Sequence, residues 1–429
     1  MLTTLRQRNF ALLWVGGLIS STGDWLLLIG MPVYVYLLTG SVLATSVTLI
    51  VGYVPNLLFS SIAGVFVDRW DRRRVMVIAN LLLAAGLLPM LLIHDQGTLW
   101  ILYPVLFFEA MVDQFVQPAQ NALLPQLVAE EQLVTANSLN SVSSSVSRLA
   151  GAALGGILLA TLGLRVTVLL DLVSFLFVAA MLWQIRLPIQ ALSEPEKAAA
   201  APAITATNSL RGAVKKLGGE WLEGIQLLLQ RAPLVVLFVI WMVTRLGEGV
   251  FGTMLVIFVK QVLDAGSVVY GSLLSVQAIG SLLGGLLIAQ FGKRLVPARM
   301  TGIGFALFGL IDLLIVDLPL FIRSIWLVGL LFILVGLPGT ASMVGMQTLL
   351  QNSVEDRLRG RIFGALFAVG SLMTLLGAIL SGLLGARLGP VLLLNIQGGS
   401  YFLSGLLALL TLDRLLERQA VTRPSSIHG

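Results

Sequence analysis

The sequence is dominated by twelve apolar segments, each as long as the roughly 20 residues that a helix needs to cross a bilayer. They lie near 10–38, 42–66, 74–94, 98–122, 138–162, 164–186, 233–260, 266–290, 297–317, 324–350, 362–385 and 391–412. These runs are too long for barrel strands and lack their alternation of polar and apolar residues. The pattern therefore predicts an all-α integral membrane protein with twelve transmembrane helices.

The composition excludes most other classes of protein. Of 429 residues, 57% are apolar and 11% are charged, whereas a soluble domain carries about a quarter charged residues. A soluble enzyme, a disordered chain and a nucleic-acid-binding domain are all excluded. The chain lacks Cys and has two His, and we find no P-loop and no H-E-x-x-H. We therefore expect no enzyme, no cofactor and no metal, and an ion gradient as the energy source.

The basic residues predict the orientation in the membrane. With the amino terminus in the cytoplasm, 21 of the 27 Lys and Arg residues fall on the cytoplasmic side and four on the outside. The remaining two, Arg148 and Arg245, lie within spans. This bias follows the positive-inside rule. It predicts that both termini are cytoplasmic, and we expect the protein in the cytoplasmic (inner) membrane of a prokaryote.

The chain divides into two six-helix bundles, 1–186 and 233–412, followed by a cytoplasmic tail, 413–429. Residues 187–232 form a linker that is rich in Ala, Pro and Thr at its start. Its second part has an apolar stripe from Leu210 to Leu228, typical of a helix on the membrane surface or of one packed on the ends of the bundle. A shift of 226 residues aligns 121–163 with 347–389, including Gly163 with Gly389. Parallel repeats of this kind predict a rocking transporter with its site between the halves.

The segment GVFVDRWDRRR, from Gly64 to Arg74, resembles the G-x-x-x-D-R-x-x-R-R signature of the major facilitator superfamily. The matching residues are Gly64, Asp68, Arg69, Arg72 and Arg73. The resemblance implies a gating latch in which Asp68 faces a helix amino terminus of the other half. The plainer alternative is a positive-inside cluster without a gating role.

The whole chain is similar to the drug:proton antiporter branch that includes macrolide exporters and enterobactin-type siderophore exporters. The phrases NFALLWVGGLISSTGDWLLLIGMPVYVYLLTGS and LLQNSVEDRLRGRIFG carry this likeness. The stretch GAALGGILLATLG resembles the antiporter motif of the exporters, but Ala152 replaces its usual proline, which leaves the transport direction open. Gly151, Gly155 and Gly156 predict close helix contact there.

Six charged residues within the spans are candidates for function, because ionisable groups are costly in lipid. We expect four acids to carry protons: Asp24, Glu109, Asp113 and Glu248. We expect cavity ion pairs of Arg148 with Glu109 or Asp113, and of Arg245 with Glu248. The alternative is that some of these charges form static pairs between helices. Three more acids are expected to be structural or interfacial, with Asp171 solvated near a helix end: Asp171, Asp312 and Asp317.

Uncharged candidates for the substrate site combine aromatic, amide and Met side chains, which suit an adaptable pocket: Trp25, Gln114, Gln117, Met343, Met346 and Gln347. The predicted function is proton-coupled export of amphiphilic small molecules by alternating access. The alternatives are a siderophore exporter, a lysophospholipid or lipid transporter and, less well supported, a non-transporting membrane receptor. The expected partners are the substrate, protons and the bilayer, without nucleic acid, and the chain is expected to be a monomer.

Overall fold

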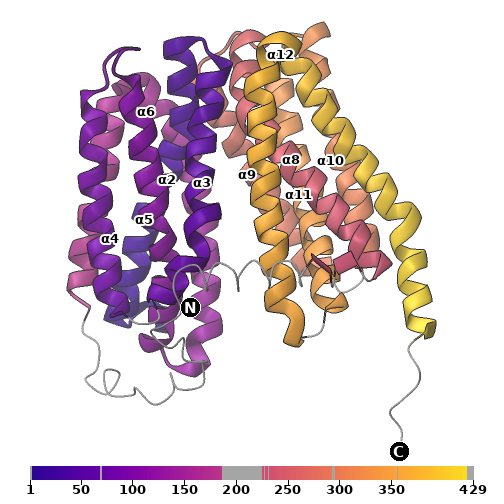
Figure 1. Cartoon of the computed structure of the whole chain (residues 1–429), viewed down its shortest axis with the longest axis horizontal. Coiled ribbons are helices and arrows are strands. Elements are labelled where there is room, and N and C mark those ends of the chain that lie inside the picture. The colour runs from indigo at the N-terminus through magenta and orange to yellow at the C-terminus, as the bar shows by residue number, and fades with distance from the viewer. Residues whose placement is uncertain are drawn as a thin grey trace, which may run out of the picture. The chain divides into compact units, whose positions relative to one another are not determined.

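A computed structural model describes residues 2–67, 70–185, 225–226, 228–229, 231–291, 295–354 and 356–422, and every regular element in them is a helix. The first half of the chain forms α1 (Leu2–Leu5), α2 (Arg8–Thr39), α3 (Val42–Val67), α4 (Arg72–Leu87), α5 (Leu102–Leu123) and α6 (Leu133–Trp183). The second half forms α8 (Ala232–Gln261), α9 (Ser267–Phe291), α10 (Pro297–Phe321), α11 (Ile325–Ser353) and α12 (Asp356–Thr422) (Figure 1). Short 3₁₀ helices lie at Leu88–Leu92, Leu99–Ile101, Leu124–Gln126 and Glu130–Gln132.

Ten helices among the described residues are long and apolar enough to cross a membrane. Two of them, in α6 and α12, extend over 49 and 54 residues, far more than one crossing requires. Each consists of two helices joined at a glycine with non-helical dihedral angles, Gly163 in α6 and Gly389 in α12. The prediction of membrane-spanning helices is confirmed. The count of twelve stays a prediction, which the division of α6 and α12 supports.

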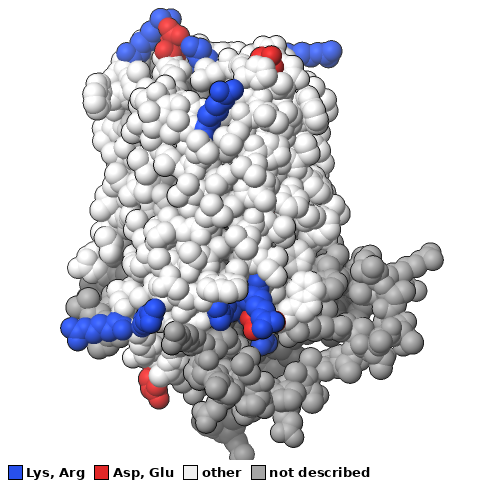
Figure 2. Space-filling view, turned by 90° about the vertical axis from the view of Figure 1, so that its left-hand side faces the viewer, with Lys and Arg blue, Asp and Glu red and all other residues white. Residues whose placement is uncertain are grey.

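The surface matches a protein surrounded by lipid. Large apolar side chains such as Leu286, Trp326 and Leu410 are exposed along the helices. Figure 2 shows charged side chains gathered towards the two ends of one face, with a broad uncharged band between them. Such a band would be unfavourable in water but suits the hydrocarbon core of a bilayer.

The chain forms two compact units. Unit 1 spans Met1–Thr205 and Asp264–Ser275, and unit 2 spans Ala206–Leu263 and Val276–Gly429. In unit 1, α2 packs mainly on α6; in unit 2, α8 packs mainly on α12. The start of α9 therefore belongs with the first unit, although the sequence assigns it to the second bundle. The predicted linker, 187–232, lies almost entirely outside the described residues.

The two units repeat the same local structures. In unit 1 the indole Nε1 of Trp14 donates a hydrogen bond to the carbonyl of Leu139. In unit 2 the indole of Trp241 donates to the carbonyl of Leu366. The joints at Gly163 and Gly389 also match, with φ of 74° and 76°. Only glycine adopts such angles readily, so the repeat seen in the sequence is matched by the backbone of both units.

Small residues let α6 approach two neighbours closely. A Cβ at Gly155 would come within 2.7 Å of the carbonyl oxygen of Leu26 in α2. A Cβ at Gly156 would collide with the carbonyl oxygen of Ser267 and lie 3.1 Å from the Cα of Gly271, both in the part of α9 that belongs to unit 1. The predicted role of the glycine-rich stretch in helix packing is confirmed.

Candidate functional site

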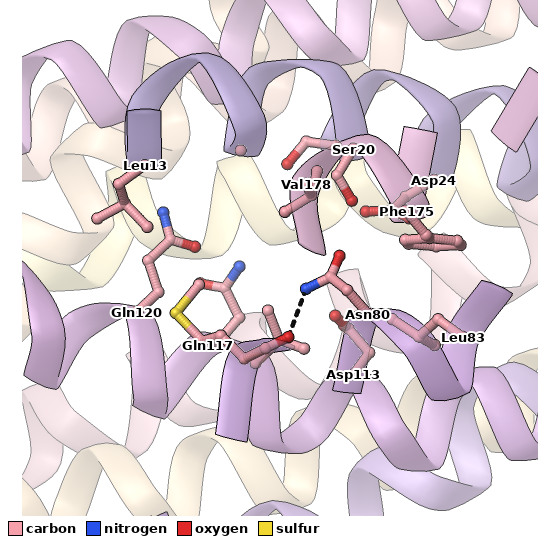
Figure 3. Close-up of a pocket in the computed structure, with 14 residues that line it drawn as sticks. Leu13, Ser20, Asp24, Asn80, Leu83, Asp113, Gln117, Gln120, Phe175 and Val178 are labelled. Carbon is pink, nitrogen blue, oxygen red and sulfur yellow. Dashed lines mark hydrogen bonds between the residues drawn. The ribbon is translucent and has the colours of Figure 1, made fainter. Parts of the chain in front are cut away.

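A polar cavity lies inside unit 1, enclosed by α2, α4, α5 and α6 (Figure 3). Its volume is about 40 Å³, and a cavity needs at least about 10–15 Å³ to hold one water molecule. Its polar lining comes from Ser20, Ser21 and Asp24 of α2, Asn80 of α4, and Asp113, Gln117 and Gln120 of α5. The cavity therefore has both the space and the hydrogen-bonding groups that hold water.

Asp24 and Asp113 both line this cavity and are exposed to solvent. Figure 3 shows Asp24 beside Phe175 of α6, and Asp113 below Asn80. The amide of Asn80 is already engaged, because its Nδ2 donates to the carbonyl of Met76 at 2.8 Å. Glu109 lies one turn before Asp113 on α5, is half-buried, and interacts electrostatically with it. These residues are three of the four predicted proton carriers, and the structure gathers them within one unit.

Asp171 of α6 joins these three acids, which corrects the expectation that it is solvated. Its side chain is 1% exposed, and its Oδ1 accepts a hydrogen bond from Ser174 at 3.2 Å. Its carboxylate also contacts Gly23 of α2, where a Cβ would overlap it. Both Asp24 and Glu109 interact electrostatically with it. The sequence shows this acid within an apolar run, but not the rotation of the helix that turns it inwards.

Within the part of the chain that the structure describes, no ion pair reaches any of these four acids. The expected partnership of Arg148 with Glu109 or Asp113 is absent there: the Arg148 side chain is exposed and makes no salt bridge with a described residue. These four acids therefore have no salt-bridge partner among the described residues.

The expected partnership of Arg245 with Glu248 is present in unit 2. Arg245 Nη1 lies 2.6 Å from Glu248 Oε2, one turn along α8. The guanidinium also lies over the ring of Trp241, 4.1 Å from its centroid, and Trp241 is held by its bond to Leu366 of α12. A stacked and paired arginine of this kind is well oriented. Glu248 thus differs from Asp24, Glu109, Asp113 and Asp171 in having a salt-bridge partner.

The residues predicted to form the latch are only partly described. Asp68 and Arg69 lie outside the described residues, and Gly64 is part of α3. Arg72 is half-buried at the start of α4. Arg73 donates through Nε to the carbonyl of Leu182 at 2.9 Å and through Nη2 to that of Trp183. These carbonyls end α6, so Arg73 satisfies a helix carboxyl terminus; the gating role stays a prediction.

The predicted substrate residues lie in different environments. Gln117 lines the polar cavity, Trp25 is half-buried against Gly151, and Gln114 donates to the carbonyl of Ala110. Met343 and Gln347 are exposed on α11 of unit 2. Met346 is only 1% exposed and packs in the hydrophobic core of unit 2. That burial corrects its assignment as a cavity residue, because the side chain faces α11's neighbours within the unit.

Four polar residues that line the cavity are not among those predicted from the sequence: Ser20, Ser21, Asn80 and Gln120. Asn80 carried a signal, since it is the one amide in a strongly apolar stretch of α4. Two further acids behave as expected of structural residues. Asp312 accepts from Gln397 at 2.8 Å, and Asp317 accepts from Asn395 at 2.7 Å. These bonds join α10 to α12.

Comparison with known proteins identifies relatives over nearly the whole chain. Macrolide efflux protein A of Streptococcus pyogenes is 28% identical over 399 residues, which cover 89% of this chain and 90% of that protein. The enterobactin exporter EntS of Salmonella typhi is 25% identical over 428 residues, with 98% and 96% covered. An uncharacterised transporter of the major facilitator type, YfiS of Bacillus subtilis, is 26% identical over 418 residues, with 94% and 93% covered.

A solved structure shares the fold. The bacterial homologue of the iron transporter ferroportin, crystallised in an inward-facing state, superposes with a TM-score of 0.73 at 16% sequence identity, covering 94% of this chain and 98% of that one. The family model described as transmembrane secretion effector matches residues 1–426. The helical bundles, the repeat and these matches agree, and the chain is a multi-pass membrane transporter that belongs to the transmembrane secretion effector family of the major facilitator superfamily.

Proposed function

We propose that this protein exports amphiphilic small molecules, including macrolide-like compounds, in exchange for protons by alternating access. It works as a monomer in the cytoplasmic membrane of a prokaryote, with both termini in the cytoplasm. The superfamily supports transport, and the relatives named as macrolide efflux proteins and as an enterobactin exporter support export. No nucleic acid, cofactor or catalytic step enters this account.

One observation carries the coupling to protons: Asp24 and Asp113 face a polar cavity of unit 1 that has room for water. A carboxylate in such a place can exchange protons with water, yet no ion pair among the described residues fixes its charge. Acids within a membrane span that lack a countercharge are costly as anions. Proton binding to Asp24, Glu109 or Asp113 therefore relieves an unfavourable charge. Glu248, paired to Arg245, is a weaker candidate for the same role.

Arg148 favours a second candidate substrate class, the siderophores. Its side chain is exposed on α6 and makes no salt bridge with a described residue. An exposed arginine can bind acidic or phenolate groups of a ligand. The enterobactin exporter among the relatives agrees with this candidate. Uptake assays should therefore include a catecholate siderophore beside the cationic dyes and macrolides.

The test uses cells that lack their own efflux pumps. Cells that express the protein should accumulate less ethidium and less of a macrolide than cells with an empty vector, and an uncoupler should remove the difference. Equal accumulation of dyes, macrolides and siderophores with and without the protein would overturn the export function. Lower accumulation that persists in the uncoupler would leave export but overturn its coupling to protons.

A further inference from the structure

We propose that Asp171 is a further proton-binding residue, which shares its titration with Asp24 across the contact between α2 and α6. This inference rests on the proposed function, because it adds a second carboxyl to the same proton site. Both residues belong to unit 1.

The carboxyl of Asp171 on α6 reaches the backbone of α2. It lies against Gly23, the residue directly before Asp24, and it fits there only because Gly23 has no side chain. Ser174 also lies 3.1 Å from where a Cβ of Gly23 would be. The glycine thus brings an acid of α6 next to the backbone of α2. Asp24 interacts electrostatically with Asp171.

Asp171 has few hydrogen-bond partners among the described residues. Its side chain is 1% exposed, and its Oδ2 is buried without a hydrogen-bond partner among the described residues. Among the described residues, Oδ1 accepts one hydrogen bond, from the hydroxyl of Ser174. Among the described residues, the charged groups that interact electrostatically with Asp171 are two acids, Asp24 from α2 and Glu109 from α5. A carboxylate so buried, with acids around it, is strongly unfavourable, whereas a carboxylic acid in the same place carries no charge.

The polar cavity gives protons access to Asp24. Asp24 lines the polar cavity, and Phe175 and Val178 of α6 line it as well. A proton that arrives by cavity water can therefore bind to Asp24 and pass to Asp171. It returns to the same water through Asp24. Asp171 then stores the proton away from solvent, while Asp24 exchanges it.

Unit 2 offers a natural comparison. The shift of 226 residues that joins Gly163 to Gly389 also joins Asp171 to Gln397. Gln397 is an amide, and it donates to Asp312, an acid that is 5% exposed. Asp312 thus has an amide partner, whereas the partner of Asp171 among the described residues is a hydroxyl. Asp312→Asn is therefore the matched control for Asp171→Asn.

The test reads protonation directly by infrared spectroscopy of the purified full-length protein over a range of pH. Asp171→Asn should remove one band of a protonated carboxylic acid that the wild type shows. In Asp24→Asn, the pH at which this band disappears should shift by about one unit or more, as for coupled acids. Asp312→Asn should leave the Asp171 band where it is. Two results would overturn the inference. One is a spectrum that Asp171→Asn leaves unchanged, and the other is an Asp171 band that disappears at the same pH in Asp24→Asn as in the wild type.

A second variant keeps the test decisive if Asp171→Asn does not fold. Gly23→Ala places a methyl group where the Asp171 carboxyl lies, so it should displace the same band, and an unmoved band would contradict the proposed contact. The infrared reading needs neither substrate nor gradient. If the infrared spectra show that Asp171 and Asp24 titrate together, but the protein shows no uncoupler-sensitive efflux, only the proposed function is overturned. Efflux with independently titrating acids would overturn only this inference.

Discussion

At the scale of single residues, two structural features single out Asp24. It faces the polar cavity, and it follows the glycine against which Asp171 packs. We expect Asp24→Asn to abolish uphill efflux of ethidium, because an amide has the shape of the acid but binds no proton. Asp312→Asn should keep wild-type efflux, since Asp312 bonds to Gln397 and lies in unit 2. Fluorescence of dye-loaded cells measures both, and full activity of Asp24→Asn would remove that residue from the coupling.

Arg148 carries a prediction about substrate class. Its side chain is exposed and makes no salt bridge with a described residue. Replacing it therefore removes a charge without breaking a salt bridge among the described residues. We expect Arg148→Gln to reduce export of a catecholate siderophore about tenfold or more, which matches the ~1.5–3 kcal/mol of a charged hydrogen bond. Ethidium efflux should stay unchanged. An equal loss for both substrates would show that Arg148 has a structural role instead.

At the scale of helices, the close approach of α6 to α9 gives a prediction about stability. Gly156→Ala adds a methyl group that collides with the carbonyl of Ser267. We expect it to lower the free energy of unfolding by about 1–3 kcal/mol, as overpacking does. Gly285→Ala, in α9 where nothing lies within 4 Å, should be neutral or stabilising by up to about 1 kcal/mol, because alanine favours helix. Thermal unfolding in detergent compares the two, and equal stability would contradict the contact.

The helices themselves could be predicted closely from the sequence. The segment 42–66 became α3 (Val42–Val67), and 266–290 became α9 (Ser267–Phe291), because an apolar run must be helical to satisfy its backbone in lipid. The depth of a side chain was harder to predict. Asp171 and Met346 were both misjudged, since their burial depends on how α6 and α11 are rotated against their neighbours, which a nearly uniform apolar pattern does not reveal.

At the scale of the whole molecule, the repeat makes the two glycine joints equivalent. Gly163 has φ 74° and ψ 177°, and Gly389 has φ 76° and ψ 165°, a region that costs other residues about 1–3 kcal/mol. We expect Gly163→Ala and Gly389→Ala to destabilise their units to the same degree within that range. Nothing lies within 4 Å of either position where the Cβ would be, so strain alone acts. Very different losses on thermal unfolding would contradict the equivalence.

The sequence predicted this two-fold organisation because the repeat was visible as identical residues 226 positions apart, Gly163 and Gly389 among them. It did not predict that Asp264–Ser275 would group with unit 1, because that division depends on the packing of Gly156 against Ser267 and Gly271. It also did not predict the cavity inside unit 1. The polar lining of that cavity comes from residues scattered over three helices, such as Ser20, Asn80 and Gln120, each unremarkable in its own segment.

The most direct test of the whole account is transport by the purified protein in proteoliposomes under an imposed pH difference. With the gradient directed so that protons move against the substrate, the wild type should concentrate a macrolide to a level above that of the bath, and an ionophore that removes the gradient should abolish this. The Asp24→Asn protein should only equilibrate the macrolide. Concentration that persists without the gradient, or concentration by Asp24→Asn equal to that of the wild type, would contradict proton-driven export through the acids of unit 1.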